Sequence, residues 1–564
     1  MATSVLLEIP RGITETEHPL RADPKILLVV PRYNLTDKVD YNYTFPLGLG
    51  YISATLKKDG YDVTILNLNH CKGTISDVLK KELDRKDYDI VGTGHTGMGY
   101  SVVKKIVGFA QEHPSKPKII LGGALITSEP ELMVKALRPD FAVISEGERT
   151  ILELLDCIEE NSDPKNVKGI IYLDGQGQVV ITAPREPIEN IDALPSPDFE
   201  GLGFGEFLGY QFTNKFYYNN QFDEPRAYPM LASRSCPFQC TFCYHAIGRK
   251  YRERSMESIM DELEHAVKKY RVNIINLYDD LFSYKKERIY EFCKRIKKLA
   301  GEVPWKIKWT CQLSVVTMDK DMLREMKESG CDIISYGFES YSQEVLKSMK
   351  KPITPQQIDF AFKSTLESKM SVQANFIFGD VAETKETAKT TLDYWKNNCQ
   401  GQVSLLFIQP YPGSEIYQHC VRKGLIKDKL NYIENDMNRA TLFNMTDKMT
   451  DEEVKELDRE IQKLRMQYGK FVTPAQLKRM NNEGVKDERY EVKVDCPFCS
   501  KEITYKNYCL QSKLMHQSYM ICRDCNMRFN ILSPLMKVSK DFYFLPTVEK
   551  YYRKITKLLW KTVR

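Results

Sequence analysis

Short apolar runs alternate with amphipathic stretches over residues 25–158. The apolar runs are Lys25–Val30, Asp62–Leu68, Ile90–Gly94, Lys118–Gly123 and Phe141–Gly147. Between them, stretches such as Gly48–Gly60 and Ser101–His113 repeat apolar residues with a helical period. Nearly continuous apolar strands separated by amphipathic helices are typical of a parallel sheet with helices on both faces. The first part of the chain is therefore predicted to be a doubly wound, Rossmann-like α/β domain.

A second series of strands and helices begins near Met230. After a first short apolar run, Tyr228–Ala232, its strand-like runs are Ile274–Tyr278, Ile307–Thr310, Ile333–Phe338, Val372–Phe378 and Ser404–Gln409. Helical patterns separate these runs, for example Ser258–Tyr270, Glu287–Leu299 and Asp319–Ser329. About six repeats of strand and helix predict a partial (β/α)6 barrel. A hairpin that turns at Asp174-Gly175 is expected between the two series.

These patterns, with the 564-residue length, suggest three or four domains joined by less regular segments. The expected divisions are an N-terminal tail over residues 1–23, the Rossmann-like domain over 24–186, a linker or lid over 187–228, the partial barrel over 229–430, a helical segment over 431–485, a cysteine-rich module over 486–535 and a basic, aromatic tail over 536–564.

Composition narrows the class of protein. Hydrophobic residues make up 42% and charged residues 28%, a globular mixture, and the net charge of +5 does not call for a nucleic acid partner. No apolar run reaches the roughly 18 residues that a transmembrane helix needs, and the first residues carry no signal-peptide pattern. We therefore expect a cytoplasmic protein, in which the fifteen cysteines are metal ligands or buried thiols rather than disulfides.

Cys236, Cys240 and Cys243 form a Cys-x3-Cys-x2-Cys loop just after the run Tyr228–Ala232. Three thiolates on one loop can hold three irons of a [4Fe-4S] cluster and leave the fourth iron open to a ligand. S-adenosylmethionine (SAM) can chelate such an iron through its amino and carboxylate groups, and an electron from the cluster then cleaves it. The alternatives are a zinc site or unrelated buried cysteines.

The loop resembles the cluster-binding loop of the radical SAM superfamily, in which an aromatic residue such as Phe242 precedes the last cysteine. The resemblance implies that Phe242 lies beside the adenine of SAM. It also implies SAM contacts by strand-end residues, which are Asp279, Asp280, Ser335 and Glu339. The alternative for each carboxylate is a solvated charge at a strand end. Residues Gly379–Thr384 depart from the family pattern, because they lack its proline and second glycine.

Glycines follow the predicted strands of the first domain, at Gly94, Gly122 and Gly123. Open parallel sheets bind ligands at this end, and glycine lets a bulky planar ligand approach the backbone. These glycine turns, together with the sequence motifs Phe45–Tyr51 and Ser145–Glu148, resemble those of the cobalamin-binding domain of cobalamin-dependent radical SAM enzymes. Cobalamin is therefore an expected cofactor, although residues 31–48 lack the histidine that many such domains supply to cobalt. The alternative is a vestigial domain that only covers the barrel mouth.

Two paired-cysteine knuckles stand near the C-terminus, Cys496-x2-Cys499 and Cys522-x2-Cys525. Four thiolates in this spacing match a closed, tetrahedral zinc site in a small zinc ribbon-like module. The module is too short to bury a large hydrophobic core, so the metal would supply much of its folding free energy. An auxiliary iron–sulfur cluster and metal-free thiols are the alternatives.

The function that the resemblance implies is SAM cleavage to a 5′-deoxyadenosyl radical, followed by methylation of an unactivated carbon of a small-molecule substrate. An electron donor such as flavodoxin or ferredoxin would reduce the cluster. A radical cyclisation or rearrangement on the same scaffold, modification of RNA, and a non-catalytic zinc-ribbon adaptor are the alternatives. The adaptor would leave the Cys236 loop unexplained.

Overall fold

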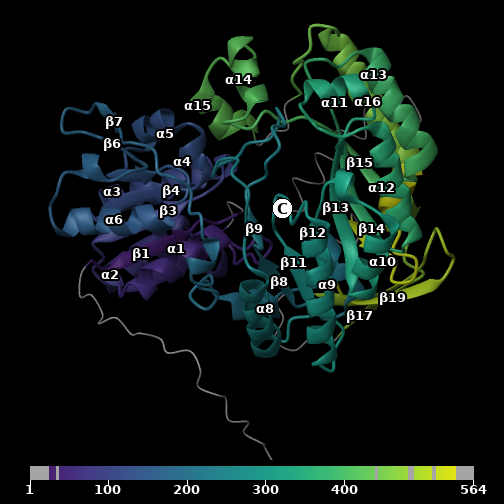
Figure 1. Ribbon diagram of the computed structural model, residues 1–564, viewed down its shortest axis with the longest axis horizontal. Helices are drawn as coiled ribbons and strands as arrows, with labels where there is room; N and C mark the ends of the chain where they lie inside the picture. The colour runs from purple at the N-terminus through teal and green to yellow at the C-terminus, as the bar shows by residue number, and fades with distance from the viewer. Residues whose placement is uncertain (1–23, 34–36, 438–441, 481–487, 511–515, 542–564) are drawn as a thin grey trace, which may run out of the picture.

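The computed structural model describes residues 24–33, 37–437, 442–480, 488–510 and 516–541. The tail predicted over residues 1–23 and most of the tail predicted over 536–564 lie outside these ranges. In the described part, the two largest sheets lie side by side, one in each half of the molecule (Figure 1). Among the described residues, no helix combines the length and the hydropathy that crossing a membrane requires.

The first sheet has the strand order β2-β1-β3-β4-β5-β6-β7. Its strands are β1 (Ile26–Val30), β2 (Val63–Asn67), β3 (Ile90–Gly94), β4 (Lys118–Gly122), β5 (Phe141–Val143), β6 (Ile170–Leu173) and β7 (Val179–Ile181). The first five are parallel, and β6 and β7 form the antiparallel hairpin predicted around Asp174. The order 2-1-3-4-5 is that of a flavodoxin-like doubly wound sheet, so the predicted fold class is confirmed here.

Helices with one apolar face cover this sheet, and they bury that face against the strands. They are α1 (Leu47–Lys58), α2 (Ile75–Arg85), α3 (Tyr100–Glu112), α4 (Ala124–Ser128), α5 (Pro130–Leu137) and α6 (Glu148–Glu159). In α2, Thr74 caps the N-terminus and Ile75, Leu79 and Leu83 are the buried residues, at the spacing of one helix face.

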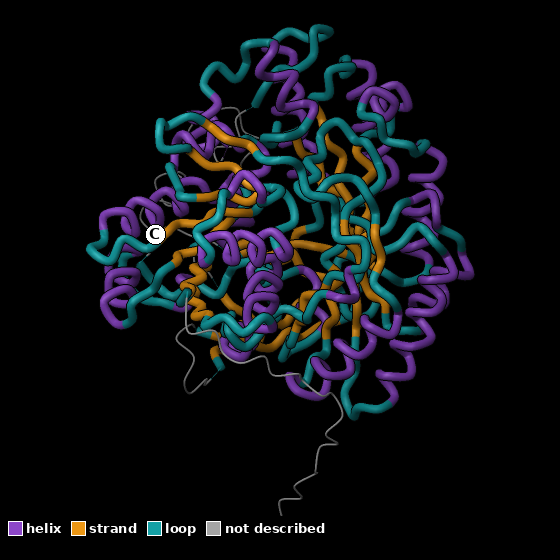
Figure 2. Tube along the Cα trace, turned by 60° about the vertical axis from the view of Figure 1, so that its left-hand side comes forward, coloured by secondary structure: helices purple, strands orange, loops and turns teal. Residues whose placement is uncertain are grey.

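The second sheet has six parallel strands in the order β15-β14-β13-β12-β11-β8. They are β8 (Ala227–Met230), β11 (Ile274–Leu277), β12 (Lys308–Gln312), β13 (Cys331–Glu339), β14 (Ser371–Phe378) and β15 (Val403–Phe407). Helices line the outer side of these strands (Figure 2); they are α8 (Met256–Tyr270), α9 (Lys286–Gly301), α10 (Lys320–Glu328), α11 (Gln343–Ser348), α12 (Pro355–Glu367) and α13 (Lys385–Tyr394). The predicted six-stranded partial barrel is therefore confirmed.

The segment between the sheets is packed rather than lid-like. It contains α7 (Phe204–Gly209) and the short helix η5 (Tyr217–Gln221). Phe199 and Phe204 are buried. Phe199 stacks with Phe45 of the first domain and Tyr228 of the barrel, and Phe204 contacts the same two rings edge-on. One hydrophobic cluster therefore runs through both domains and the segment that joins them.

After the barrel come α14 (Glu415–Arg422), α15 (Lys429–Asn431) and α16 (Asp451–Tyr468). The prediction of a helical segment to residue 485 is wrong beyond Tyr468, because Gly469 and Pro474 stop the helix and the chain continues as strands. The C-terminal module holds two three-stranded sheets, β16-β21-β20 and β17-β18-β19, followed by α17 (Pro534–Asp541). Its strands are β16 (Phe471–Val472), β17 (Gln476–Arg479), β18 (Arg489–Asp495), β19 (Glu502–Cys509), β20 (Gln517–Ile521) and β21 (Arg528–Leu532).

Candidate active site

The three-cysteine loop leaves the carboxyl end of β8 through β9 (Ser233–Arg234), which pairs with β10 (Arg252–Glu253). Two backbone hydrogen bonds of Thr241 anchor the loop, from its N–H to the Met349 carbonyl (3.0 Å) and from the Ile416 N–H to its carbonyl (3.0 Å). Cys240 is buried, and Cys236 and Cys243 are partly exposed. The thiols of Cys240 and Cys243 are within hydrogen-bonding reach of one another.

The three loop thiols are not gathered around one point as the ligands of a single metal ion would be. Among the described residues, the only group compact enough to hold one metal ion is the C-terminal set of four cysteines. A four-iron cubane holds its three thiolates farther apart than the ligands of one zinc ion lie, so the loop geometry is compatible with the expected [4Fe-4S] cluster.

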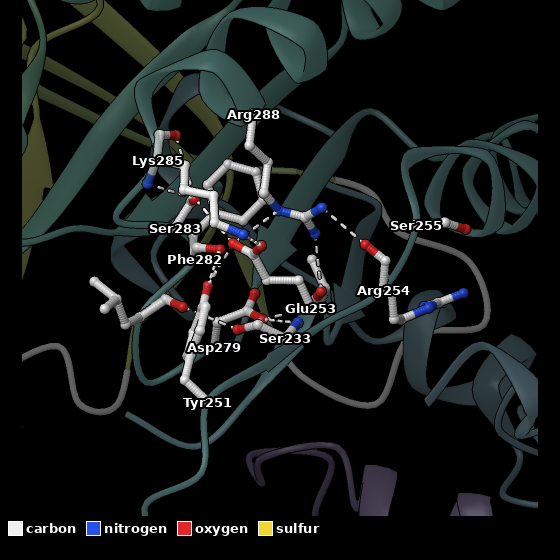
Figure 3. Close-up of polar contacts among 12 residues, drawn as sticks. Ser233, Tyr251, Glu253, Arg254, Ser255, Asp279, Phe282, Ser283, Lys285 and Arg288 are labelled. Carbon is white, nitrogen blue, oxygen red and sulfur yellow. Dashed lines mark hydrogen bonds and ion pairs between the residues drawn. The ribbon is translucent and has the colours of Figure 1, made fainter. Parts of the chain in front are cut away.

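Asp279 braces the start of this loop (Figure 3). Its Oδ1 accepts hydrogen bonds from the Ala232 N–H (2.9 Å), the Ser233 hydroxyl (2.6 Å) and the Ser233 N–H. The side chain is buried, and this burial raises the pKa of Asp279 to about 7 despite those hydrogen bonds. Asp279 was expected to touch SAM, whereas the neighbouring Asp280 is exposed and lines the main cavity described below.

Glu339 ends β13 in a left-handed backbone conformation, with φ of +61°. Its carboxylate pairs with Lys351, whose Nζ lies 3.2 Å from Glu339 Oε1. Burial opposes the charge of Lys351, but Glu339 and the thiols of Cys240 and Cys243 raise the pKa of Lys351 above its ordinary value. A Cβ at Gly337 would overlap the Glu339 carboxylate and lie 2.5 Å from Lys351 Nζ, so a larger residue here would have to displace this ion pair. Sequence reasoning found Glu339 but missed Lys351 and Gly337.

The other two residues expected to contact SAM lie at different levels of the barrel, Phe242 on the cysteine loop and Ser335 within β13. Phe242 is half-buried and packs in one cluster with Ile377 of β14 and Val381. Ser335 lies four residues before Glu339 on β13 and close to the hydroxyl of Tyr217. In the loop that departs from the family pattern, Glu383 bonds its own chain instead, through the Gly379 N–H (3.3 Å) and the Thr387 hydroxyl (2.9 Å).

A cavity of about 720 Å³ joins the two domains. Gly94, Gly122 and Gly123 line it from the first sheet, and Ser233, Arg234 and Ser235 line it from the cysteine loop. A Cβ at Gly94 would lie 2.7 Å from the Gly122 carbonyl oxygen, and Gly123 has φ of +81°, whereas nothing lies within 4 Å of a Cβ at Gly122. The glycines therefore keep the strand ends close and the backbone open, which fits a large planar cofactor such as cobalamin. His95 also lines this cavity.

Buried ion pairs join the domains beside this cavity. Glu146 accepts from Arg234 Nη1 (2.6 Å) and from Arg252 Nη1 (2.7 Å), and Glu148 accepts from Arg234 Nη2 (2.5 Å). All four side chains are at most 9% exposed. The segment Ser145–Glu148 therefore lies at the domain interface, where its partner Arg234 precedes the first cluster cysteine, Cys236, by two residues.

The four C-terminal cysteines converge. The Sγ atoms of Cys496, Cys499, Cys522 and Cys525 all lie within 4.8 Å of one another, with 3.7 Å between Cys496 and Cys525 and 3.8 Å between Cys499 and Cys522. Four thiols at this spacing form a metal-binding group.

Two domain families match the sequence, one within each of the two domains described above. Residues 37–155 match the B12 binding domain, and residues 230–394 match the Radical SAM superfamily. The chain is a radical SAM enzyme with a B12-binding domain. These families imply SAM, a [4Fe-4S] cluster and cobalamin as the cofactors of this radical SAM enzyme.

Relatives of the enzyme include methyltransferases. The uncharacterized methyltransferase PH0819 of Pyrococcus horikoshii is 29% identical over 406 residues, or 71% of this chain and 84% of that protein. The cytidylyl-2-hydroxyethylphosphonate methyltransferase of Streptomyces wedmorensis is 25% identical over 467 residues, or 74% of this chain and 85% of that protein. The radical S-adenosylmethionine methyltransferase TsrM from Kitasatospora setae shares the fold with a TM-score of 0.59, at 16% identity, over 71% of this chain and 77% of that chain.

Proposed function

We propose that this enzyme transfers a methyl group to an unactivated carbon of a small molecule. The observation that carries the proposal is the single cavity of about 720 Å³, which the strand ends of the B12-binding domain share with the cysteine loop of the barrel. A substrate in that space would lie against both cofactor sites at once. The methyltransferases among the relatives support the same reaction class.

When bound, the cluster supplies the electron that cleaves SAM to methionine and a 5′-deoxyadenosyl radical, and cobalamin supplies a methyl group that can be transferred as a radical. The protein's task is to hold these groups around one carbon. Cys236, Cys240 and Cys243 would ligate the cluster, Asp279 fixes the loop that carries them, and Asp280 and Glu339 would contact SAM. The strand-end glycines would leave room for the corrin.

We further infer that the C-terminal cysteines hold zinc, because four thiolates close a tetrahedral shell and leave no open position for chemistry. The module docks on the barrel and the joining segment through side chains such as Asn214, Gln402 and Arg523. This docking favours a structural role over RNA binding. A flavodoxin or ferredoxin would supply the electron.

The test is anaerobic reconstitution of the full chain with iron, sulfide and cobalamin, followed by reduction in the presence of SAM that carries a deuterated methyl group. The proposal predicts methylcobalamin, 5′-deoxyadenosine and a metabolite from a cell extract that gains the labelled methyl. Products that form with 5′-deoxyadenosine but never carry the label would indicate a radical cyclisation or rearrangement instead.

A further inference from the structure

The C-terminal module holds one arginine, Arg528, against the barrel through hydrogen bonds to its backbone. Arg528 begins β21, and its backbone is held on both sides by Gln402, which is fully buried before β15. The Arg528 N–H donates to Gln402 Oε1 (2.7 Å), and Gln402 Nε2 donates to the Arg528 carbonyl (2.9 Å). Asn526 adds a hydrogen bond to the Lys369 carbonyl, just before β14. The position of Arg528 relative to the barrel strands is therefore fixed.

The side chain of Arg528 reaches the inner face of the barrel. Its Nη1 donates to Gln373 Oε1 on β14 (3.2 Å). Val372, Ala374 and Phe376 belong to the core that packs on the outer helices, so Gln373, which alternates with them, faces the inside. Gln373 pairs with Ser335 of β13, whose side chain lies close to Tyr217.

This inner face is partly open. Along β14, the outward residues are buried, whereas Gln373, Asn375 and Ile377 are only half-buried, and Ser335 of β13 behaves in the same way. At the starts of the barrel strands, Ala227, Ile274 and Ile333 pack in an apolar cluster with Tyr218 and Ile521. The polar side chains of Ser335, Gln373 and Asn375 lie on β13 and β14, where the residues are only half-buried.

Arg528 has no acidic partner there. Among the described residues, no carboxylate pairs with it, the charged or ionisable groups that act on it are Tyr217 and Tyr519, and its Nε is buried without a hydrogen-bond partner. Burial lowers the pKa of Arg528 to about 10, so the guanidinium still carries its charge at neutral pH. Arg528 as a whole is partly exposed, but its Nε atom is buried without a partner. Buried polar atoms of charged groups are normally paired, because leaving them unpaired costs free energy.

We propose that Arg528 binds an oxyanion of the substrate, a carboxylate or a phosphate, on the floor of the barrel. The inference rests on the proposed function, since it assumes that the substrate enters the barrel. Ser335 pairs with Gln373 and Glu339 pairs with Phe376, so the guanidinium lies three β14 residues below the strand ends, or about 10 Å. The substrate would therefore place its anionic group roughly 10 Å from the carbon that reacts near the cluster.

The four-cysteine metal-binding group would contribute to anion binding indirectly, by fixing the position of Arg528. Cys522 and Cys525 lie in the turn between β20 and β21, and Cys525 precedes Arg528 by three residues. A metal ion on these thiols would hold the turn that aims the arginine, which gives the C-terminal module a role in substrate specificity.

The experiment titrates the reconstituted full-length enzyme with inorganic phosphate and, separately, with acetate by anaerobic isothermal titration calorimetry. We expect saturable binding of at least one anion at one site, and the tighter one identifies the class. Arg528→Gln should weaken that binding about tenfold or more, as the loss of a bidentate, charge-assisted contact does. Arg459→Gln on α16 removes the same charge from an exposed position and should leave the binding unchanged.

A second measurement needs no variant. Phenylglyoxal modification of Arg528 in the wild-type enzyme, mapped by mass spectrometry, should slow in the presence of the anion that binds. Absence of saturable binding, unchanged binding in Arg528→Gln, or absence of protection would overturn the inference. Substrate-free cleavage of SAM to 5′-deoxyadenosine should be the same in Arg528→Gln and wild type. If wild type itself fails to cleave SAM, the proposed function fails, while the anion titration still decides the role of Arg528.

Discussion

Removal of the charge of Glu146 tests whether buried ion pairs hold the B12-binding domain on the barrel. Glu146 is the shared partner of Arg234 and Arg252, and it also accepts the Ile188 N–H at 2.8 Å. Glu146→Gln keeps the shape but leaves Arg252 without a carboxylate, whereas Arg234 keeps Glu148. Glu148→Gln is the matched control, because it leaves both arginines paired with Glu146.

The expected magnitudes differ. Loss of one partner of a buried ion pair costs about 3–5 kcal/mol, because the remaining charge stays desolvated. Glu146→Gln should therefore lower the free energy of unfolding by that amount. Glu148→Gln removes one hydrogen bond from a guanidinium that still pairs with Glu146, which costs about 1–3 kcal/mol. Glu146→Gln should therefore destabilise the protein more than Glu148→Gln, because only Glu146 contacts both arginines.

The lowered pKa of Glu146 fixes the direction in which its contribution to stability changes with pH. Burial favours the protonated form of Glu146, but the bonds from Arg252 and Arg234 outweigh it and hold the pKa below its ordinary value. A carboxyl group with a lowered folded pKa stabilises the protein above its unfolded pKa of about 4.3, and this stabilisation is lost as the pH falls through the folded pKa. Glu146→Gln should therefore lose less stability than wild type on acidification.

The assay is urea unfolding under anaerobic conditions, followed by circular dichroism and fluorescence at pH 7 and below pH 4. Since a chain of several domains need not unfold in one step, the first transition is the one compared. If Glu146→Gln is no less stable than Glu148→Gln, the ion pairs do not hold the interface.

Three further perturbations address the site itself. Gly337→Ala should displace the Glu339–Lys351 pair and reduce 5′-deoxyadenosine formation by at least about tenfold while the fold, followed by circular dichroism, is retained; full activity would contradict the steric argument. Cys240→Ala should abolish 5′-deoxyadenosine formation and leave the metal content of the C-terminal module unchanged, and residual cleavage of SAM would refute the cluster assignment. Because the folded pKa of Asp279 is about 7 and its unfolded value is lower, its contribution to stability is largest below the unfolded pKa and declines as the pH rises towards 7. Asp279→Asn should therefore show a smaller change in unfolding midpoint between pH 5.5 and pH 8 than wild type, and equal changes would contradict the burial argument.

Local patterns predicted the elements, because buried parallel strands such as β1 and β13 must be apolar over their length and because cysteine spacing is a local property. The contacts made between distant segments escaped this reasoning. Lys351 pairs with Glu339 from beyond helix α11, and the Asp279 carboxylate holds Ser233 instead of lining the cavity. The strands β16 and β17 also exist only because they pair with β21 and β18, which lie later in the chain.

Arg234 links the segment that carries the cluster cysteines to the B12-binding domain. This arginine stands two residues before Cys236, on the strand that leads into the cluster loop, and it is also the residue through which Glu146 and Glu148 hold the B12-binding domain. A shift of that domain would therefore pull on the same short segment that carries the first cluster ligand. In the proposed reaction, the SAM-derived radical and cobalamin must both reach one substrate carbon, and misplacement by about 1 Å costs about a hundredfold in rate. The buried ion pairs of Arg234 with Glu146 and Glu148 would hold the two cofactor sites at a fixed separation, so that both reach one carbon.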